Sequence, residues 1–132
     1  MPISPAFLDT SFVVRYLTDD SPEMAARAAE VIDGDESLIL SELVLLEAAY
    51  VLVSVYRVPR AEVVEALSAL VQRQNERLLT LGKPEALEAL TLCKDSGRVS
   101  FTDALLWAQA RQAGAARIHT FDERFPRLDP RR

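Results

Sequence analysis

Four acidic side chains in this sequence have the types and positions that could bind divalent cations. Glu47 is the only charged residue in the otherwise apolar stretch LVLLEAAYVLV, residues 43–53. A carboxylate inside or beside a protein core must be neutral, paired or bound to a metal, because a bare buried charge is costly. The other three acids are Asp9, Asp103 and Asp122. Mg²⁺ and Mn²⁺ prefer oxygen ligands, so a cluster of these carboxylates predicts a site for such ions.

A cluster of this kind is suited to phosphodiester cleavage. Two hard cations about 4 Å apart can activate a water and stabilise the leaving oxygen. Without cations, crowded carboxylates repel one another and raise one another's pKa. Nucleophilic catalysis by Ser–His–Asp or Cys–His groups has no support, because His119 and Cys93 are the only residues of their types. We expect Cys93 to be a core residue and His119 to be a structural residue of a strand.

The elements that must position these acids alternate between short apolar runs and longer helical patterns. Strands are expected at residues 6–8, 37–40, 78–81 and 117–120, and helices at 11–17, from 22 to near 34, from 41 or 42 to before 59, at 60–74, from 84 to near 97, and at 102–113. Strands separated by helices predict an α/β fold, in which helices cover both faces of a parallel sheet.

The predicted sheet would bring the four acids to one edge. Asp9 directly follows the first expected strand, and Asp122 lies two residues after the last one. Asp103 falls in the first turn of its helix, and Glu47 falls in the second turn of the helix after the second strand. In open parallel sheets, sites form at the carboxyl ends of the strands, where the following helices begin. We therefore expect the four carboxylates to converge there.

Each acid also has a structural interpretation that involves no metal. Asp9, Asp103 and Asp122 could cap a helix or turn, or lie in its first turn, where the helix dipole favours an acid. Glu47 could lie on an exposed stripe of its helix. Two further acids are better explained as first-turn residues and are left out of the predicted site: Glu23 and Glu42.

Length and composition fit one globular domain of 132 residues, with 49% hydrophobic and 27% charged residues. The sequence has no apolar run of about 18 residues and no signal-peptide pattern, and its cysteine is alone, so we expect a cytoplasmic protein. A net charge of −5 excludes a basic protein that simply coats nucleic acid. An acidic protein can still act on nucleic acid if its carboxylates surround divalent cations.

Four segments of the sequence resemble the PIN domain, and specifically the VapC-type toxins of prokaryotic type II toxin–antitoxin systems. They are FLDTSFVVRYL, LSELVLLEAAYVL, VSFTDALLWAQARQAG and IHTFDERFPRL. Each motif is short, but the four occur in order and the resemblance covers essentially the whole chain. It implies a single PIN domain over residues 1–132, with a three-layer α/β/α sandwich around a central, mainly parallel sheet of four to five strands.

The resemblance also implies roles for individual residues. The four acids Asp9, Glu47, Asp103 and Asp122 correspond to the catalytic, metal-binding acids of the family around Mg²⁺ or Mn²⁺, with Asp9 and Asp103 as the firmest ligands. Three hydroxyl residues correspond to supporting positions: Thr10, Ser11 and Thr120. Thr120 is expected to brace the turn before the last acid. Ser11 replaces a common Asn and Ser100 a common Asp, and both departures leave the four acids intact.

A protein of this kind would be a divalent-metal-dependent endoribonuclease. The resemblance implies that it cleaves RNA as the toxin of a toxin–antitoxin pair, that a cognate VapB-like antitoxin neutralises it, and that it forms a homodimer. The alternative is a catalytically silent PIN-fold module that binds RNA or protein, against which the four intact acids argue. A phosphoacceptor receiver domain would need an Asp that ends a central strand and a Lys after the last strand, and the sequence has neither.

Overall fold

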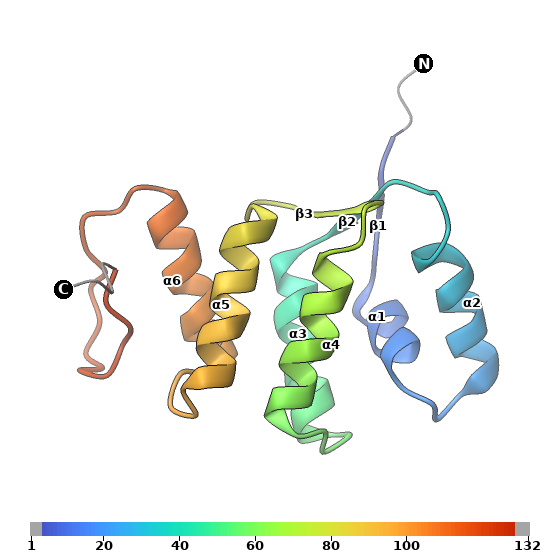
Figure 1. The fold of residues 1–132 in the computed structure, drawn as a ribbon, viewed down its shortest axis with the longest axis horizontal. Helices are drawn as coiled ribbons and strands as arrows, with labels where there is room; N and C mark the ends of the chain where they lie inside the picture. Colours follow the sequence, from blue (N-terminus) through green and yellow to red (C-terminus); the bar gives the residue numbers. More distant parts are fainter. Residues whose placement is uncertain (1–3, 129–132) are drawn as a thin grey trace.

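Three short parallel strands form the sheet of the computed structural model, which describes residues 4–128 (Figure 1). Strands β1 (Ala6–Phe7), β2 (Leu38–Leu40) and β3 (Glu76–Leu78) pair in the order β1-β2-β3. Leu38 of β2 lies between Ala6 and Glu76 of its neighbours, and all three residues of β2 are buried. An apolar run buried on both faces is typical of a parallel sheet covered by helices.

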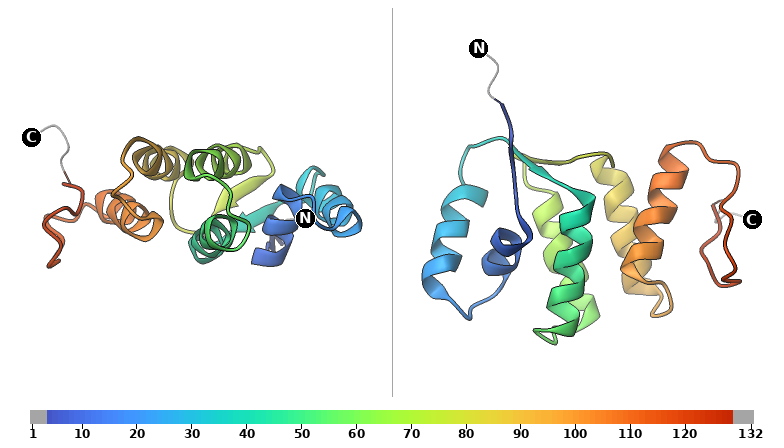
Figure 2. Two further views of the ribbon diagram at one scale, coloured as in Figure 1. Left: turned by 90° about the horizontal axis from the view of Figure 1, so that it is seen from below. Right: turned by 180° about the vertical axis from the view of Figure 1, so that it is seen from behind.

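Helices cover both faces of this sheet (Figure 2). They are α1 (Thr10–Leu17), α2 (Pro22–Ile32), α3 (Glu42–Ser54), α4 (Arg60–Val71), α5 (Lys83–Asp95) and α6 (Phe101–Gln112). One layer contains α1, α3 and α6, the other contains α4 and α5, and α2 packs against α1. Within residues 4–128, no helix is both long and apolar enough to cross a membrane. The predicted α/β class with a parallel sheet is confirmed.

Short polar side chains start the three helices that carry the candidate acids. Asp9, Ser41 and Ser100 each accept a hydrogen bond from a backbone N–H in the first turn of α1, α3 and α6, respectively. Such caps satisfy N–H groups that have no partner within the helix. The predicted helix starts therefore lie within one residue of the observed starts, because local side-chain chemistry determines them.

The chain after α6 differs from the prediction. Residues 117–120 are not a strand, and the described residues contain three strands instead of the expected four to five. Gly114, with φ of +76°, ends α6, and Ala115 donates its N–H to the Ala110 carbonyl at 2.9 Å. Residues 115–128, which we call the C-terminal arm, then run along the outer side of α6 (Figure 1). The Trp107 indole holds the end of the arm by donating to the Arg127 carbonyl at 2.6 Å.

Glu42 connects the start of α3 to the end of β3. Its carboxylate is 9% exposed and accepts hydrogen bonds from the backbone N–H groups of Thr80 at 3.0 Å and Leu81 at 2.7 Å. The last backbone bond to β2 runs from the Leu79 N–H to the Leu40 carbonyl at 3.2 Å, and Thr80 and Leu81 donate to Glu42 instead. Strand β3 therefore ends at Leu78 and not at Leu81, where the sequence predicted its end. Glu42 is thus a structural acid, as expected from its exclusion from the site, although its role is larger than that of a first-turn acid.

Glu76, at the start of β3, is the most buried acid of the described residues. It is 3% exposed, and neither carboxylate oxygen has a hydrogen-bond partner. Burial raises the pKa of Glu76 to about 7, against the opposing effect of the positive charges of Lys83 and Arg73. The side chain is therefore partly protonated at neutral pH.

We expect the substitution Glu42→Ala to destabilise the protein by about 2 kcal/mol, because one buried and one partly buried N–H group would lose a charged acceptor. Urea unfolding measures this. The control is Glu62→Ala, which removes an exposed first-turn acid of α4 and should change the free energy of unfolding by less than about 0.5 kcal/mol. Equal stability of the two variants would show that Glu42 does not fix the α3–β3 connection.

We expect Glu76→Gln to remove a pH dependence of stability. The pKa of Glu76 is raised above its usual 4.5, so its protonated form contributes stability below pH 4.5 that is lost as the pH rises through 7. Glutamine resembles the protonated acid at every pH. Relative to the wild type, the variant should therefore gain about 2–3 kcal/mol between pH 5 and pH 8 in urea unfolding. A constant difference would contradict the raised pKa.

Candidate active site

Asp9 lies where β1 passes into α1 and is both a helix cap and an exposed anion. Its Oδ2 accepts hydrogen bonds from the Ser11 hydroxyl at 2.7 Å and the Ser11 backbone N–H at 3.3 Å. The Ser11 hydroxyl bond, followed by the backbone bonds, lowers the pKa of Asp9 below its usual 3.8. The cap interpretation is confirmed, and it is compatible with a metal site because the ionised carboxylate remains exposed to solvent.

Glu47 lies on the exposed side of α3, next to α1. Its Oε1 accepts a hydrogen bond from the Thr10 hydroxyl at 2.5 Å. The expectation that Glu47 points into or beside the core is wrong, and the exposed-stripe interpretation is confirmed. Leu43 and Tyr50, on the same side of the helix, are 79% and 66% exposed. The apolar stretch thus includes both a core face and an uncovered apolar surface, which its sequence alone does not distinguish.

Thr10 brings the first two acids together. It directly follows Asp9, and its hydroxyl contacts Glu47 although the two residues are 37 positions apart in the sequence. Ser11 holds one carboxylate and Thr10 the other, so the two predicted supporting residues both contact predicted site acids.

Asp103 approaches α3 from its other side. It lies in the first turn of α6, where its backbone N–H donates to the Ser100 hydroxyl at 3.0 Å. The preceding Thr102 lines a cleft of about 190 Å³ together with Leu46 and Tyr50 of α3. Helices α1, α3 and α6 form one layer (Figure 2). Asp103 therefore belongs to the same layer as Asp9 and Glu47 and follows a residue that lines a cleft together with the helix of Glu47.

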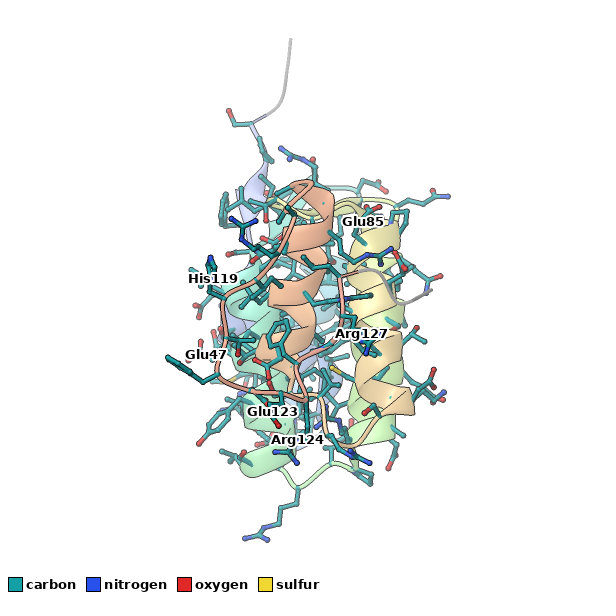
Figure 3. All side chains as sticks on the ribbon, turned by 90° about the vertical axis from the view of Figure 1, so that its left-hand side faces the viewer. Glu47, Glu85, His119, Glu123, Arg124 and Arg127 are labelled. Atoms are coloured by element: carbon teal, nitrogen blue, oxygen red, sulfur yellow. The ribbon has the colours of Figure 1, made fainter. Side chains whose placement is uncertain are left out.

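Asp122 is not brought to the other acids. It lies on the C-terminal arm, where its N–H donates to the Thr120 hydroxyl at 3.0 Å and its Oδ1 accepts from the Arg124 N–H at 2.9 Å. The bracing role of Thr120 and the capping role of Asp122 are confirmed. The structure shows no contact between Asp122 and the other three acids, because the arm that carries it packs along α6 and not in the sheet. His119 of the arm is exposed and not in a strand (Figure 3).

The donor chemistry of Asp9 and Glu47 fits a hard divalent cation. Mg²⁺ takes one or two carboxylates and fills its remaining positions with waters and substrate phosphate oxygens. Among residues 4–128, no three acids, histidines or cysteines gather closely enough to hold a metal by themselves. The structure thus supplies two carboxylates joined through Thr10, and a third, Asp103, on the neighbouring helix.

A cleft of about 270 Å³ between α1 and α2 shares Ser11 with the acids. It is lined by Ser11, Phe12, Arg15, Met24, Arg27 and Ala28. Arg15 pairs with Asp20, whereas Arg27 is exposed and has no ion-pair partner among the described residues. Sequence reasoning missed these cations because they lie on two separate helices, and only the packing of α2 against α1 brings them into one cleft with Ser11, which holds Asp9.

We expect Ser11→Ala to raise the pKa of Asp9 toward 3.8, because the strongest hydrogen bond to its charged form is removed. The lowered pKa in the wild type means that ionised Asp9 stabilises the fold above pH 3.8 and that this contribution is lost as the pH falls. Carboxyl-carbon NMR titration measures the pKa. Thr10→Val is the control, since Thr10 donates its hydroxyl to Glu47 and should leave the Asp9 titration unchanged.

A comparison with known protein families identifies the family of this chain. The chain matches the PIN domain family over residues 6–130, which includes all four predicted acids. A search of curated proteins found no significant match. Since the match covers nearly the whole sequence, and the α/β fold with a parallel sheet agrees with it, the chain belongs to the PIN domain family.

Proposed function

We propose that this protein is a divalent-metal-dependent endoribonuclease. The PIN domain is a nuclease fold. The observation that carries the proposal is the hydrogen bond from Thr10 to Glu47, which joins the Asp9 turn to α3 on an exposed surface. An ionised Asp9, an oriented Glu47 and Asp103 on the adjacent helix are the oxygen donors that such a nuclease needs.

In the proposed site, Mg²⁺ or Mn²⁺ would be held by Asp9, Glu47 and Asp103, with Asp122 as the fourth acid. When bound, the ion would activate a water and stabilise the charge on the phosphate undergoing cleavage. Two hydroxyl groups of the chain contact the proposed ligands. The Ser11 hydroxyl lowers the pKa of Asp9 by hydrogen bonding to its ionised form, and the Thr10 hydroxyl donates to the Glu47 carboxylate.

Clefts on both sides of the acids offer room for an RNA strand. The α1–α2 cleft carries Arg15 and Arg27 and includes Ser11, which holds Asp9, and the α3–α6 cleft includes Thr102, which precedes Asp103. Guanidinium groups bind phosphate oxygens, and the aromatic rings of Phe12 and Tyr50 in these clefts are suited to stack on bases. These local cations provide RNA contacts although the chain has a net charge of −5.

We further propose that the nuclease is the cytoplasmic toxin of a VapC-type toxin–antitoxin pair, a homodimer that a cognate VapB-like antitoxin neutralises. The resemblance in sequence supports this role. So does the uncovered apolar surface of Leu43 and Tyr50 around Glu47, because a partner that covers it would also block the acids. The alternative is a catalytically silent PIN-fold module, which would bind RNA or protein regardless of the acids.

We expect the protein to cleave single-stranded RNA in Mg²⁺ or Mn²⁺ and to lose this activity in EDTA. Asp9→Asn, Glu47→Gln and Asp103→Asn should each lower the rate by roughly 100-fold or more, because the loss of a ligand removes several kcal/mol of transition-state stabilisation. The matched control is Asp19→Asn, because Asp19 is exposed and the structure shows no hydrogen bond or ion pair for it. Gel assays of labelled RNA measure cleavage, and circular dichroism checks the fold.

The outcomes separate the two proposed functions. RNA binding that persists in all three variants without any cleavage by the wild type would favour the silent module. Cleavage that resists both EDTA and the acid substitutions would contradict the proposed site. Growth arrest on expression, relieved by Asp103→Asn and by a small DNA-binding protein encoded next to this gene, would support the toxin role.

A further inference from the structure

The guanidinium group of Arg60 is held at the junction of three helices. Arg60 is the first residue of α4, and its Nε donates a hydrogen bond to the Cys93 carbonyl of α5 at 3.0 Å. Its Cζ lies 4.9 Å from the centre of the Phe101 ring of α6, a distance at which a cation is attracted to an aromatic face. These two contacts join α4 to α5 and α6, and they also fix the guanidinium group in one orientation.

No acid neutralises this cation. Within residues 4–128, Arg60 has no ion-pair partner, and its Nη2 is buried without a hydrogen-bond acceptor. The neighbouring Cys93 thiol does not supply a negative charge, because burial raises its pKa. A positive charge that water reaches poorly attracts an anion more strongly than a charge on an open surface does. The structural contacts of Arg60 therefore leave its charge available to a ligand.

Arg60 lines the cleft of about 190 Å³ between α3 and α6. Among the described residues around this cleft, it is the only charged one, and most of the wall is apolar. Tyr50 forms part of the wall and is 66% exposed. Ser54 and Thr102 add hydroxyl side chains. The cleft thus combines a fixed cation, an exposed aromatic ring and hydroxyl groups in apolar surroundings.

The cleft adjoins the candidate acids. Leu46 of its wall directly precedes Glu47, and Thr102 directly precedes Asp103. Helices α3 and α6, which carry these residues, lie in one layer (Figure 2). An RNA strand whose scissile phosphate reaches the acids would therefore extend into the cleft with the nucleotide next to that phosphate.

We propose that the cleft binds the nucleotide next to the scissile phosphate of RNA, with Arg60 on a phosphate of that nucleotide and Tyr50 on its base. The planar guanidinium group matches two phosphate oxygens at once. An exposed aromatic ring stacks on a base of any sequence. The start of α6, capped by Ser100 at the same cleft, adds the partial positive charge of the helix dipole.

The composition of the cleft favours a nucleotide over other anions. A free phosphate ion would pair with Arg60 but leave Tyr50 and the apolar wall uncovered, and an acidic peptide would offer no base to stack on Tyr50. A nucleotide supplies both the charge and the flat ring. The place of the cleft in RNA cleavage rests on the proposed nuclease function, whereas the binding of a nucleotide rests on Arg60 and Tyr50 alone.

Nucleotide binding is tested without any activity measurement. Adenosine 5′-monophosphate is titrated into the protein in EDTA, and NMR follows the backbone amides and the Arg60 Nε–H. We expect shifts at Tyr50, Ser54 and Thr102. Tyr50→Ala should weaken binding about 10-fold, because it removes the stacking surface. Tyr50→Phe is the matched control, since it keeps the ring and should bind as the wild type does.

The variant Arg60→Gln should weaken the same binding about 10-fold, because it removes a charge-assisted hydrogen bond to the phosphate. Arg77→Gln is its control, since it removes the same charge from an exposed position of β3 outside the cleft and should change the affinity little. Circular dichroism checks the fold of Arg60→Gln, because Arg60 also contacts Phe101. Where that variant does not fold, Tyr50→Ala at its exposed position decides the test.

The place of the cleft in cleavage is tested with RNA that lacks one base. Removal of the base on one side of the cleavage point should lower kcat/KM about 10-fold for the wild type. Each side is examined in turn, and the same removal should have no further effect in Tyr50→Ala. In Arg60→Gln, the slope of log KM against log salt concentration should fall by about 0.7, since one phosphate contact is lost. A purely structural defect would change neither the base dependence nor this slope.

The outcomes keep this proposal separate from the nuclease proposal. Unchanged nucleotide affinity in folded Arg60→Gln and Tyr50→Ala, or shifts confined to another part of the protein, would overturn the binding of a nucleotide in the cleft. A wild type that cleaves RNA but is indifferent to the missing base on either side would overturn the subsite and leave the nuclease proposal intact. Nucleotide binding without RNA cleavage would support the cleft and contradict the proposed function. Shifts in the cleft that an acidic peptide causes and the nucleotide does not would identify a protein ligand and overturn the proposal.

Discussion

The buried carboxylate of Glu42 is the constraint on which the candidate site depends. By accepting the N–H groups of Thr80 and Leu81, it fixes the first turn of α3 against the end of β3. Five residues later, α3 presents Glu47 to the Thr10 hydroxyl. The sheet positions Asp9 through β1 and positions Glu47 through β3 and Glu42. Two carboxylates do not attract each other. The geometry of the backbone therefore brings these two acids together.

Among the described residues, the buried acids and the acids proposed for the site are different residues. Among residues 4–128, two acids are buried, Glu42 and Glu76. Both lie in or beside the sheet, and only Glu42 has hydrogen-bond donors to offset its desolvation. Glu76 instead responds by a raised pKa. The candidate site acids Asp9 and Glu47 are exposed and hydrogen-bonded by hydroxyl groups. An exposed, ionised carboxylate can exchange water for a cation at low cost, which a buried one cannot.

The sequence predicted those features that local chemistry determines. The caps at Asp9, Ser41 and Ser100 gave the helix starts, and the alternation of strands and helices gave the parallel sheet. Two expectations were wrong where tertiary context decides. Glu47 was expected to lie in or beside the core because apolar residues surround it, yet Leu43 and Tyr50 are exposed with it. Residues 117–120 have strand composition, but composition cannot specify whether an edge of the sheet takes them up as a further strand.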